Sequence, residues 1–328
     1  MTVDDATSDL QRALDALTST APLEAPPPLP AAPAGGTAAL SGDAIADAPT
    51  QQSTAAADVR LTGPLDEAWL ELWYQPKIDL RQKCLAGAEA IARIRHPELG
   101  VLSPENYLPG ADHDSLTRLM ASALRKSLDD WSIFSESGFN LRLAINIPVK
   151  LLFDLPIIAL VSERRPSAEH WPGLIVGVTE DQFVRDAKRL RDIADELRAA
   201  GVAVAIDDFG AGYSSFSAMR ELTFAEIKIN RSFVQQCTTD ATNAAICQTA
   251  IDLAHRFGST AVADGIENIS DLQTLQIMGC DFGQGALLAP PMTKERFIEL
   301  LRQRVSKPRV PRAVSLEDSE PSSSRLSA

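Results

Sequence analysis

Residues 202–210 read VAVAIDDFG, an apolar run that ends abruptly in two adjacent aspartates. Three further apolar runs end in the same way, at Glu89, Asn146 and Asp264. Carboxylates are rarely buried unless they are paired or bind a metal ion. The sequence therefore predicts strands whose carboxyl ends meet at one end of a sheet or barrel and share a divalent-cation site there.

Strand and helix patterns alternate on both sides of this stretch. The expected strands are 72–78, 84–91, 141–146, 174–178, 202–206, 225–229, 260–264 and 281–284. The expected helices are 115–136, 149–163, 183–200, 214–221, 240–257, 270–278 and 293–304. This alternation predicts an α/β fold, a (β/α)8 TIM-like barrel. An open doubly wound sheet is the alternative, but no glycine-rich phosphate loop follows any of these strands.

The first two expected strands are separated only by a short turn around Arg81-Gln82-Lys83. A crossover between parallel strands needs about a dozen residues or more. We therefore expect the first strand to run antiparallel to the second, which gives a barrel with one antiparallel strand.

Composition divides the chain into three parts and excludes several functions. Residues 1–60 are rich in alanine and proline and are expected to be disordered, as is the tail 306–328, so the barrel domain is 61–305. A formal net charge of −13 argues against binding to nucleic acid. The four cysteines lack CxxC spacing, the N-terminus lacks a signal-peptide pattern, and no apolar stretch could span a membrane. These features predict a cytoplasmic protein.

In a barrel, the carboxyl ends of the strands form one mouth, and that mouth carries the chemistry. The polar residues expected there are Glu89, Asn146, Asp207, Asp208, Lys228 and Asp264, with Glu267 close by. Two cations ~3.5–4 Å apart can hold a bridging water as the nucleophile and clamp a phosphodiester. The adjacent aspartates could each serve one cation, and Lys228 could orient the water or steady the phosphate.

The chain resembles the EAL-type cyclic-di-GMP phosphodiesterases in several segments over roughly residues 65–304. They are YQP at 74–76, EAIAR at 89–93, RHP at 95–97, DDFGAGYSS at 207–215, IKIN at 227–230, ADGIE at 263–267 and GCDFGQG at 279–285. The resemblance implies a (β/α)8-type barrel with one antiparallel strand. It also implies hydrolysis of cyclic di-GMP to linear pGpG with Mg²⁺ or Mn²⁺.

Site roles follow from the same resemblance, residue by residue. Metal-site positions are matched by Glu89, Asn146, Asp207, Asp208 and Asp264. Catalytic positions are matched by Lys228, Glu267 and Gln284, of which Glu267 adjoins the metal site. Positions that hold the dinucleotide are matched by Gln75, Ile91 and Arg93, and the forked donors of the arginine suit a phosphate. Glu180 matches a glutamate that anchors the DDFG loop, which in the family also links dimerisation to activity.

Two departures from the family pattern concern the metal site. Gly177 stands where the family has a glutamate that binds metal directly. Asp264 stands where the family has a glutamate one methylene longer, and such a shortening moves a carboxylate by over ~1 Å, which can cost ~100-fold in rate. Other changes include Ile91 in the signature triplet and Asn230 in place of an aspartate.

The leading hypothesis is a protein of cyclic-di-GMP signalling that binds the dinucleotide with weak or lost phosphodiesterase activity, and Mg²⁺ or Mn²⁺ only if metal binds at all. The first alternative is an active metal-dependent phosphodiesterase in which water replaces the missing ligand. The second is a ligand-free module that interacts with a protein partner or forms a homodimer.

Overall fold

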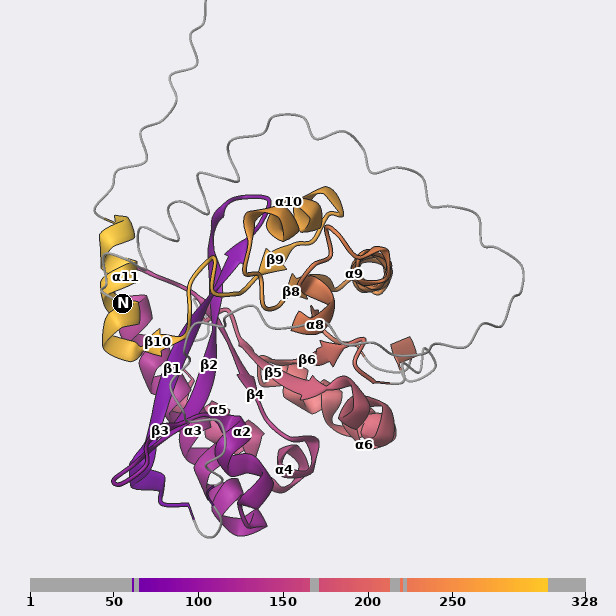
Figure 1. Ribbon diagram of the computed structural model, residues 1–328. Helices are drawn as coiled ribbons and strands as arrows, with labels where there is room; N and C mark the ends of the chain where they lie inside the picture. The colour runs from indigo at the N-terminus through magenta and orange to yellow at the C-terminus, as the bar shows by residue number, and fades with distance from the viewer. Residues whose placement is uncertain (1–60, 62–64, 166–170, 213–218, 221–222, 306–328) are drawn as a thin grey trace, which may run out of the picture.

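The computed structural model describes residues 61, 65–165, 171–212, 219–220 and 223–305, which fold into a closed barrel surrounded by helices (Figure 1). The predicted disordered segments 1–60 and 306–328, and most of the expected helix 214–221, lie outside the described residues. The strands of the barrel are β1 (Leu70–Asp79), β2 (Cys84–His96), β4 (Arg142–Asn146), β5 (Leu174–Thr179), β6 (Val202–Phe209), β7 (Glu226–Ile229), β8 (Thr260–Ala263) and β9 (Phe282–Gly283).

The strand order confirms the predicted barrel with one antiparallel strand. From β2 to β9, neighbouring strands of the barrel are parallel. β1 closes the ring by pairing antiparallel with both β2 and β9. Two short strands extend the sheet outside the ring: β3 (Gly100–Leu102) pairs with β2, and β10 (Met292–Thr293) pairs with β1.

Helices cover the outside of the barrel. The longer ones are α3 (His113–Glu136), α5 (Ile157–Arg164), α6 (Glu180–Ala199), α9 (Ala241–Arg256), α10 (Ile269–Ile277) and α11 (Lys294–Val305). The shorter ones are η1 (Glu67–Trp69), α2 (Pro104–Tyr107), η2 (Leu108–Gly110), α4 (Val149–Asp154) and α8 (Arg231–Val234). Across the described residues, no helix is both long and apolar enough to cross a bilayer.

The prediction of one helix over 149–163 was wrong, because the structure has two helices there. α4 ends at Asp154, and Leu155 is extended with φ −84° and ψ 135°. The next residue is Pro156, which precedes α5. A proline disfavours helical backbone in the residue before it and cannot donate a helical hydrogen bond, so the chain breaks here.

Successive side chains along each strand point alternately outward, into an apolar core, and inward, into the barrel interior. Side chains such as Val176, Ile206 and Ile227 are fully buried in the core shared with the helices. Ala144, Ile175 and Ala205 form a separate small cluster. Because the side chains of this second cluster are mostly short, the interior has room for long polar side chains, and these form the candidate site.

Candidate active and ligand-binding site

The carboxyl ends of the parallel strands open into a cavity of about 500 Å³. Nine of the residues predicted from the sequence line it: Gln75, Glu89, Ile91, Arg93, Asn146, Asp207, Asp208, Lys228 and Asp264. Gly177 lines the same cavity. The structure thus brings together residues that are up to 189 positions apart in the chain, from Gln75 to Asp264.

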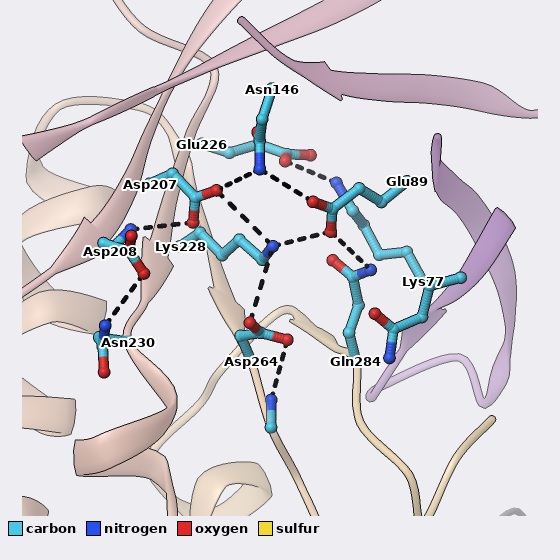
Figure 2. A network of polar contacts seen from close by, with 12 residues as sticks. Lys77, Glu89, Asn146, Asp207, Asp208, Glu226, Lys228, Asn230, Asp264 and Gln284 are labelled. Atoms are coloured by element: carbon cyan, nitrogen blue, oxygen red, sulfur yellow. Dashed lines mark hydrogen bonds and ion pairs between the residues drawn. The ribbon is translucent and has the colours of Figure 1, made fainter. Parts of the chain in front are cut away.

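Lys228 on β7 lies at the centre of the carboxylates (Figure 2). Its Nζ is 2.7 Å from Glu89 Oε2, 3.7 Å from Asp264 Oδ2 and 3.8 Å from Asp207 Oδ2. The side chain of Lys228 is only 13% exposed, so solvent screens these contacts weakly. One ammonium therefore neutralises part of the negative charge that the strand ends bring together.

Burial and charge act on the pKa values of this cluster in opposite directions. Burial alone would lower the pKa of Lys228, but the surrounding carboxylates raise it well above its usual value. Burial alone would raise the pKa of Glu89, but Lys228 lowers it overall. Burial raises the pKa of Asp207 to about 6, although Lys228 opposes the shift, and burial also raises the pKa of Asp264.

Asn146 bridges two of the carboxylates with the nitrogen of its amide. Nδ2 donates to Glu89 Oε1 at 2.9 Å and to Asp207 Oδ2 at 2.6 Å (Figure 2). Its Oδ1 points toward Gly177 on the neighbouring strand, and a Cβ atom at position 177 would be only 1.9 Å from this oxygen. Asn146 therefore occupies the space into which a longer residue at position 177 would extend.

The adjacent aspartates at the end of β6 diverge. Asp208 has a positive φ of 56°, a backbone conformation that aspartate tolerates better than most residues. Its Oδ1 accepts a hydrogen bond from Asn230 Nδ2 at 2.9 Å, whereas Asp207 faces Lys228 and Asn146. The Oδ1 of Asn230 accepts from the Ser232 backbone N–H, so each end of this amide has a partner.

This arrangement does not fit a ready-made centre for two divalent cations. The oxygen donors are of the kind that Mg²⁺ and Mn²⁺ prefer. However, Lys228 lies among three of the carboxylates, Asn146 donates to two of them, and Gly177 supplies no donor. Within the residues that the structure describes, no three His, Cys, Asp or Glu side chains are grouped so as to hold a metal ion.

Sequence reasoning missed a buried ion pair deeper in the barrel. Lys77 Nζ on β1 is 2.6 Å from Glu226 Oε2 on β7, and the two side chains are 6% and 10% exposed. Gln284, predicted to be catalytic, is also buried and donates from Nε2 to Glu89 Oε2 at 3.2 Å. Two-residue spacing could have placed each side chain on the interior face, since Lys77 follows Gln75 and Glu226 precedes Lys228, but it could not have shown that the two side chains pair.

The predicted ligand-binding residues lie along one wall of the cavity. The guanidinium of Arg93 lies 4.7 Å from the ring centroid of Trp73, on the paired strand. Arg93 Nε is buried and has no hydrogen-bond partner among the described residues. Gln75 Nε2 donates to the Ala289 carbonyl at 3.4 Å. Trp73 was not predicted as part of the site, and it holds Arg93 through a cation–π contact.

Glu180 and Glu267 do not line the cavity. Glu180 Oε2 accepts hydrogen bonds from the backbone N–H groups of Gly210 and Gly212, at 3.0 and 3.1 Å. It thus holds the chain that follows β6, the position expected for a loop anchor. Glu267 accepts hydrogen bonds from Arg231 and Gln235 beside the mouth, and neither contact joins it to the cluster around Lys228.

The raised pKa of Asp207 predicts a pH-dependent stability. A native pKa of about 6, above the ordinary 3.8, means that the folded state binds this proton more tightly than the unfolded state. The stabilisation is fully present below pH 3.8 and is lost as pH rises to about 6, by an amount of order 3 kcal/mol. Urea unfolding at several pH values between 3.8 and about 6 should show that the free energy of unfolding decreases as pH rises.

Asp207→Asn is the matched control, because it keeps an oxygen acceptor for Asn146 and removes the titration. Between pH 3.8 and about 6, the stability of Asp207→Asn should depend less on pH than that of the wild type. The histidines contribute equally to the pH dependence of both proteins. Equal slopes in the two proteins would contradict the assignment to Asp207.

Comparison with known proteins gives one family and several relatives. Residues 58–291 match the family model described as the EAL domain. The chain is 34% identical over 242 residues to the cyclic di-GMP phosphodiesterase PA2567 of Pseudomonas aeruginosa, an alignment that covers 72% of this chain and 41% of that protein. It is 30% identical over 237 residues to the cyclic di-GMP phosphodiesterase RocR of the same organism, covering 72% and 60%.

Among solved structures, the fold resembles the PaMucR phosphodiesterase in complex with c-di-GMP. The TM-score is 0.64 at 30% identity, and the match covers 70% of this chain and 94% of that one. This chain spans less than two thirds of the length of the two curated relatives, so their full-length activities do not transfer directly.

Proposed function

This chain belongs to the EAL domain family, and from that premise we propose that it binds cyclic di-GMP at the mouth of its barrel with weak or lost hydrolysis. One observation carries the second half of the proposal. Gly177 lacks a side chain where the resemblance implies a metal-binding glutamate, and the amide of Asn146 occupies the adjacent space. The position of a negatively charged ligand for a cation is thus taken by a neutral amide that donates to two carboxylates.

Binding is supported by the shape and the chemistry of the cavity. Its volume of about 500 Å³ lies in the range of small-molecule sites. Arg93 borders it with a buried Nε that has no partner among the described residues, and a phosphate could supply an acceptor. Gln75 and Ile91 line the same cavity and supply polar and apolar contact area for a dinucleotide.

Weak hydrolysis is supported by the electrostatics at the strand ends. Lys228 and Asn146 already satisfy oxygens of Glu89 and Asp207. A cation entering here would have to displace the amide or compete with the ammonium, at a site that lacks the donor of position 177. Mg²⁺ or Mn²⁺ is therefore proposed to bind weakly.

An active phosphodiesterase is the second candidate, and one finding favours it. The chain is 34% identical to a relative named as a cyclic di-GMP phosphodiesterase. Asp208 and Asp264 also line the cavity. Asp264 lies 3.7 Å from the Lys228 ammonium, and Asp208 has no contact with Lys228 among the described contacts. In this alternative, water would complete the coordination of a cation held by these side chains.

Arg93→Ala should weaken cyclic-di-GMP binding by roughly 10- to 150-fold, since a charge-assisted hydrogen bond to a ligand contributes about 1.5–3 kcal/mol. Calorimetric titration of the dinucleotide, with and without Mn²⁺, measures the change. Arg95→Ala is the matched control, because Arg95 is on the same strand but is exposed and paired with Glu71. Equal affinities of Arg93→Ala and the wild type would exclude Arg93 from the binding site.

A further inference from the structure

A second cavity, of about 340 Å³, lies at the opposite end of the barrel. Arg142, which lines it, is the first residue of β4, whereas Asn146 at the candidate site is the last. With a rise of about 3.3 Å per residue, the two ends of this strand are roughly 13 Å apart. The two cavities share no lining residue.

The lining of this second cavity is basic, in a chain whose net charge is −13. Arg142, Arg165 and Arg198 line it, and its described lining includes no carboxylate. Arg198 pairs with Asp195 on the same helix, an exposed contact of 2.9 Å that leaves most of the guanidinium donors available. Arg165 is exposed at the end of α5. The three guanidinium groups come from three different elements, so the fold gathers them.

The guanidinium of Arg142 has a buried donor that lacks an acceptor among the residues that the structure describes. Its Nε is buried and has no hydrogen-bond partner among the described residues. A buried donor without an acceptor costs about 1–3 kcal/mol, so such groups in native proteins usually face a water molecule or an ion. Since the cavity beside this guanidinium is lined by two more arginines, an anion suits it better than water alone.

The remaining wall of the cavity is shaped by close backbone packing. Gly201 has φ +81°, and a Cβ atom there would lie 2.6 Å from the ring of Trp171. Gly173 has φ +87°, and a Cβ atom there would lie 2.6 Å from the Gly201 carbonyl oxygen and 3.8 Å from Arg142 Nη2. Trp171 and Pro172 add apolar surface to the lining of the cavity.

We propose that this arginine cavity binds the phosphate group of a small phosphorylated molecule. Planar forked donors from several arginines match the oxygens of a phosphate, and their combined positive charge favours a dianion. The apolar surface of Trp171 and Pro172 would contact the organic part of the ligand. The site is distinct from the mouth and does not depend on how cyclic di-GMP binds there.

The test is a calorimetric titration of the full chain with inorganic pyrophosphate in metal-free buffer. Wild type should bind saturably, and Arg142→Gln should weaken binding at least ~10-fold. Arg165→Gln, at an exposed position that folding tolerates, should weaken it in the same direction. A loss of binding in Arg93→Ala but not in Arg142→Gln would place the pyrophosphate at the mouth of the barrel and overturn the proposal.

Arg256→Gln is the matched control for general charge. Arg256 is an exposed arginine at the end of α9 that does not line the cavity. An equal loss of pyrophosphate affinity in Arg256→Gln and Arg142→Gln would show that binding depends only on net charge and would overturn the proposal. Absence of saturable binding by wild type up to ~10 mM would overturn it as well.

The chain itself also contains an acidic sequence, Glu317-Asp318-Ser319-Glu320. A triple variant, Glu317→Gln, Asp318→Asn and Glu320→Gln, tests whether this acidic segment, rather than a free phosphate, occupies the cavity. Unchanged pyrophosphate affinity in the triple variant supports the small-molecule site. Binding that appears only in the triple variant would assign the cavity to the tail and overturn the proposal.

Discussion

Glu226→Ala is expected to lower the free energy of unfolding by about 3–5 kcal/mol, because it leaves the buried ammonium of Lys77 without its partner. The two groups are 2.6 Å apart, and their side chains are 6% and 10% exposed. Lys77 also lies 6.0 Å from the ring centroid of Phe282, a contact too weak to replace a carboxylate. Urea unfolding at neutral pH gives the free-energy difference.

Two controls separate the loss of a charge partner from the loss of packing. The double variant Lys77→Met with Glu226→Leu removes both charges at similar volume and should recover most of the stability. Asp129→Ala breaks the exposed pair with Arg164, whose side chains are 45% and 51% exposed, and should cost less than about 1 kcal/mol. A Glu226→Ala effect as small as that of Asp129→Ala would show that Lys77 reaches solvent.

Gly177→Glu combined with Asp264→Glu is expected to raise phosphodiesterase turnover by ~100-fold or more, since the positions of ligands determine the rate so steeply. The new Cβ at position 177 would meet Asn146 Oδ1 at 1.9 Å. That oxygen is the end of a flexible side chain, so Asn146 is expected to rotate and release Glu89 and Asp207. Nucleotide analysis after incubation with Mn²⁺ measures the gain.

Gly177→Gln with Asp264→Glu is the control, because glutamine displaces Asn146 equally and lacks the charge. A gain from the glutamate variant alone would assign the defect to the missing carboxylate. If neither variant gains activity, the weak turnover has its cause elsewhere, for example in the chain that follows Asp208 and is anchored by Glu180.

The barrel could be predicted because its strands end in a distinctive way. The apolar runs that stop at Glu89 and Asp207 defined both the strand direction and the end that carries the site. The short turn at 81–83 likewise required an antiparallel β1. In contrast, the break between α4 and α5 depends on Pro156, which the apolar pattern over 149–163 obscured.

Nine residues that line the candidate cavity could be named from the sequence, but the contacts among them could not. An asparagine at a metal position can present oxygen or nitrogen, and only its neighbours decide which. Here the nitrogen of Asn146 faces Glu89 and Asp207, and its oxygen faces the space beside Gly177. The pair of Lys77 and Glu226 joins β1 to β7 across the interior, so no local pattern could connect them.

The central claim, binding with little hydrolysis, is tested most directly by equilibrium dialysis of the full chain against cyclic di-GMP with Mn²⁺. Both compartments are analysed for nucleotides after several hours. We expect an excess of intact cyclic di-GMP on the protein side and little pGpG. Conversion to pGpG at ~1 s⁻¹ would contradict it and establish the active enzyme. Equal nucleotide on both sides at hundreds of micromolar, with no pGpG formed, would contradict it in favour of a ligand-free interaction module.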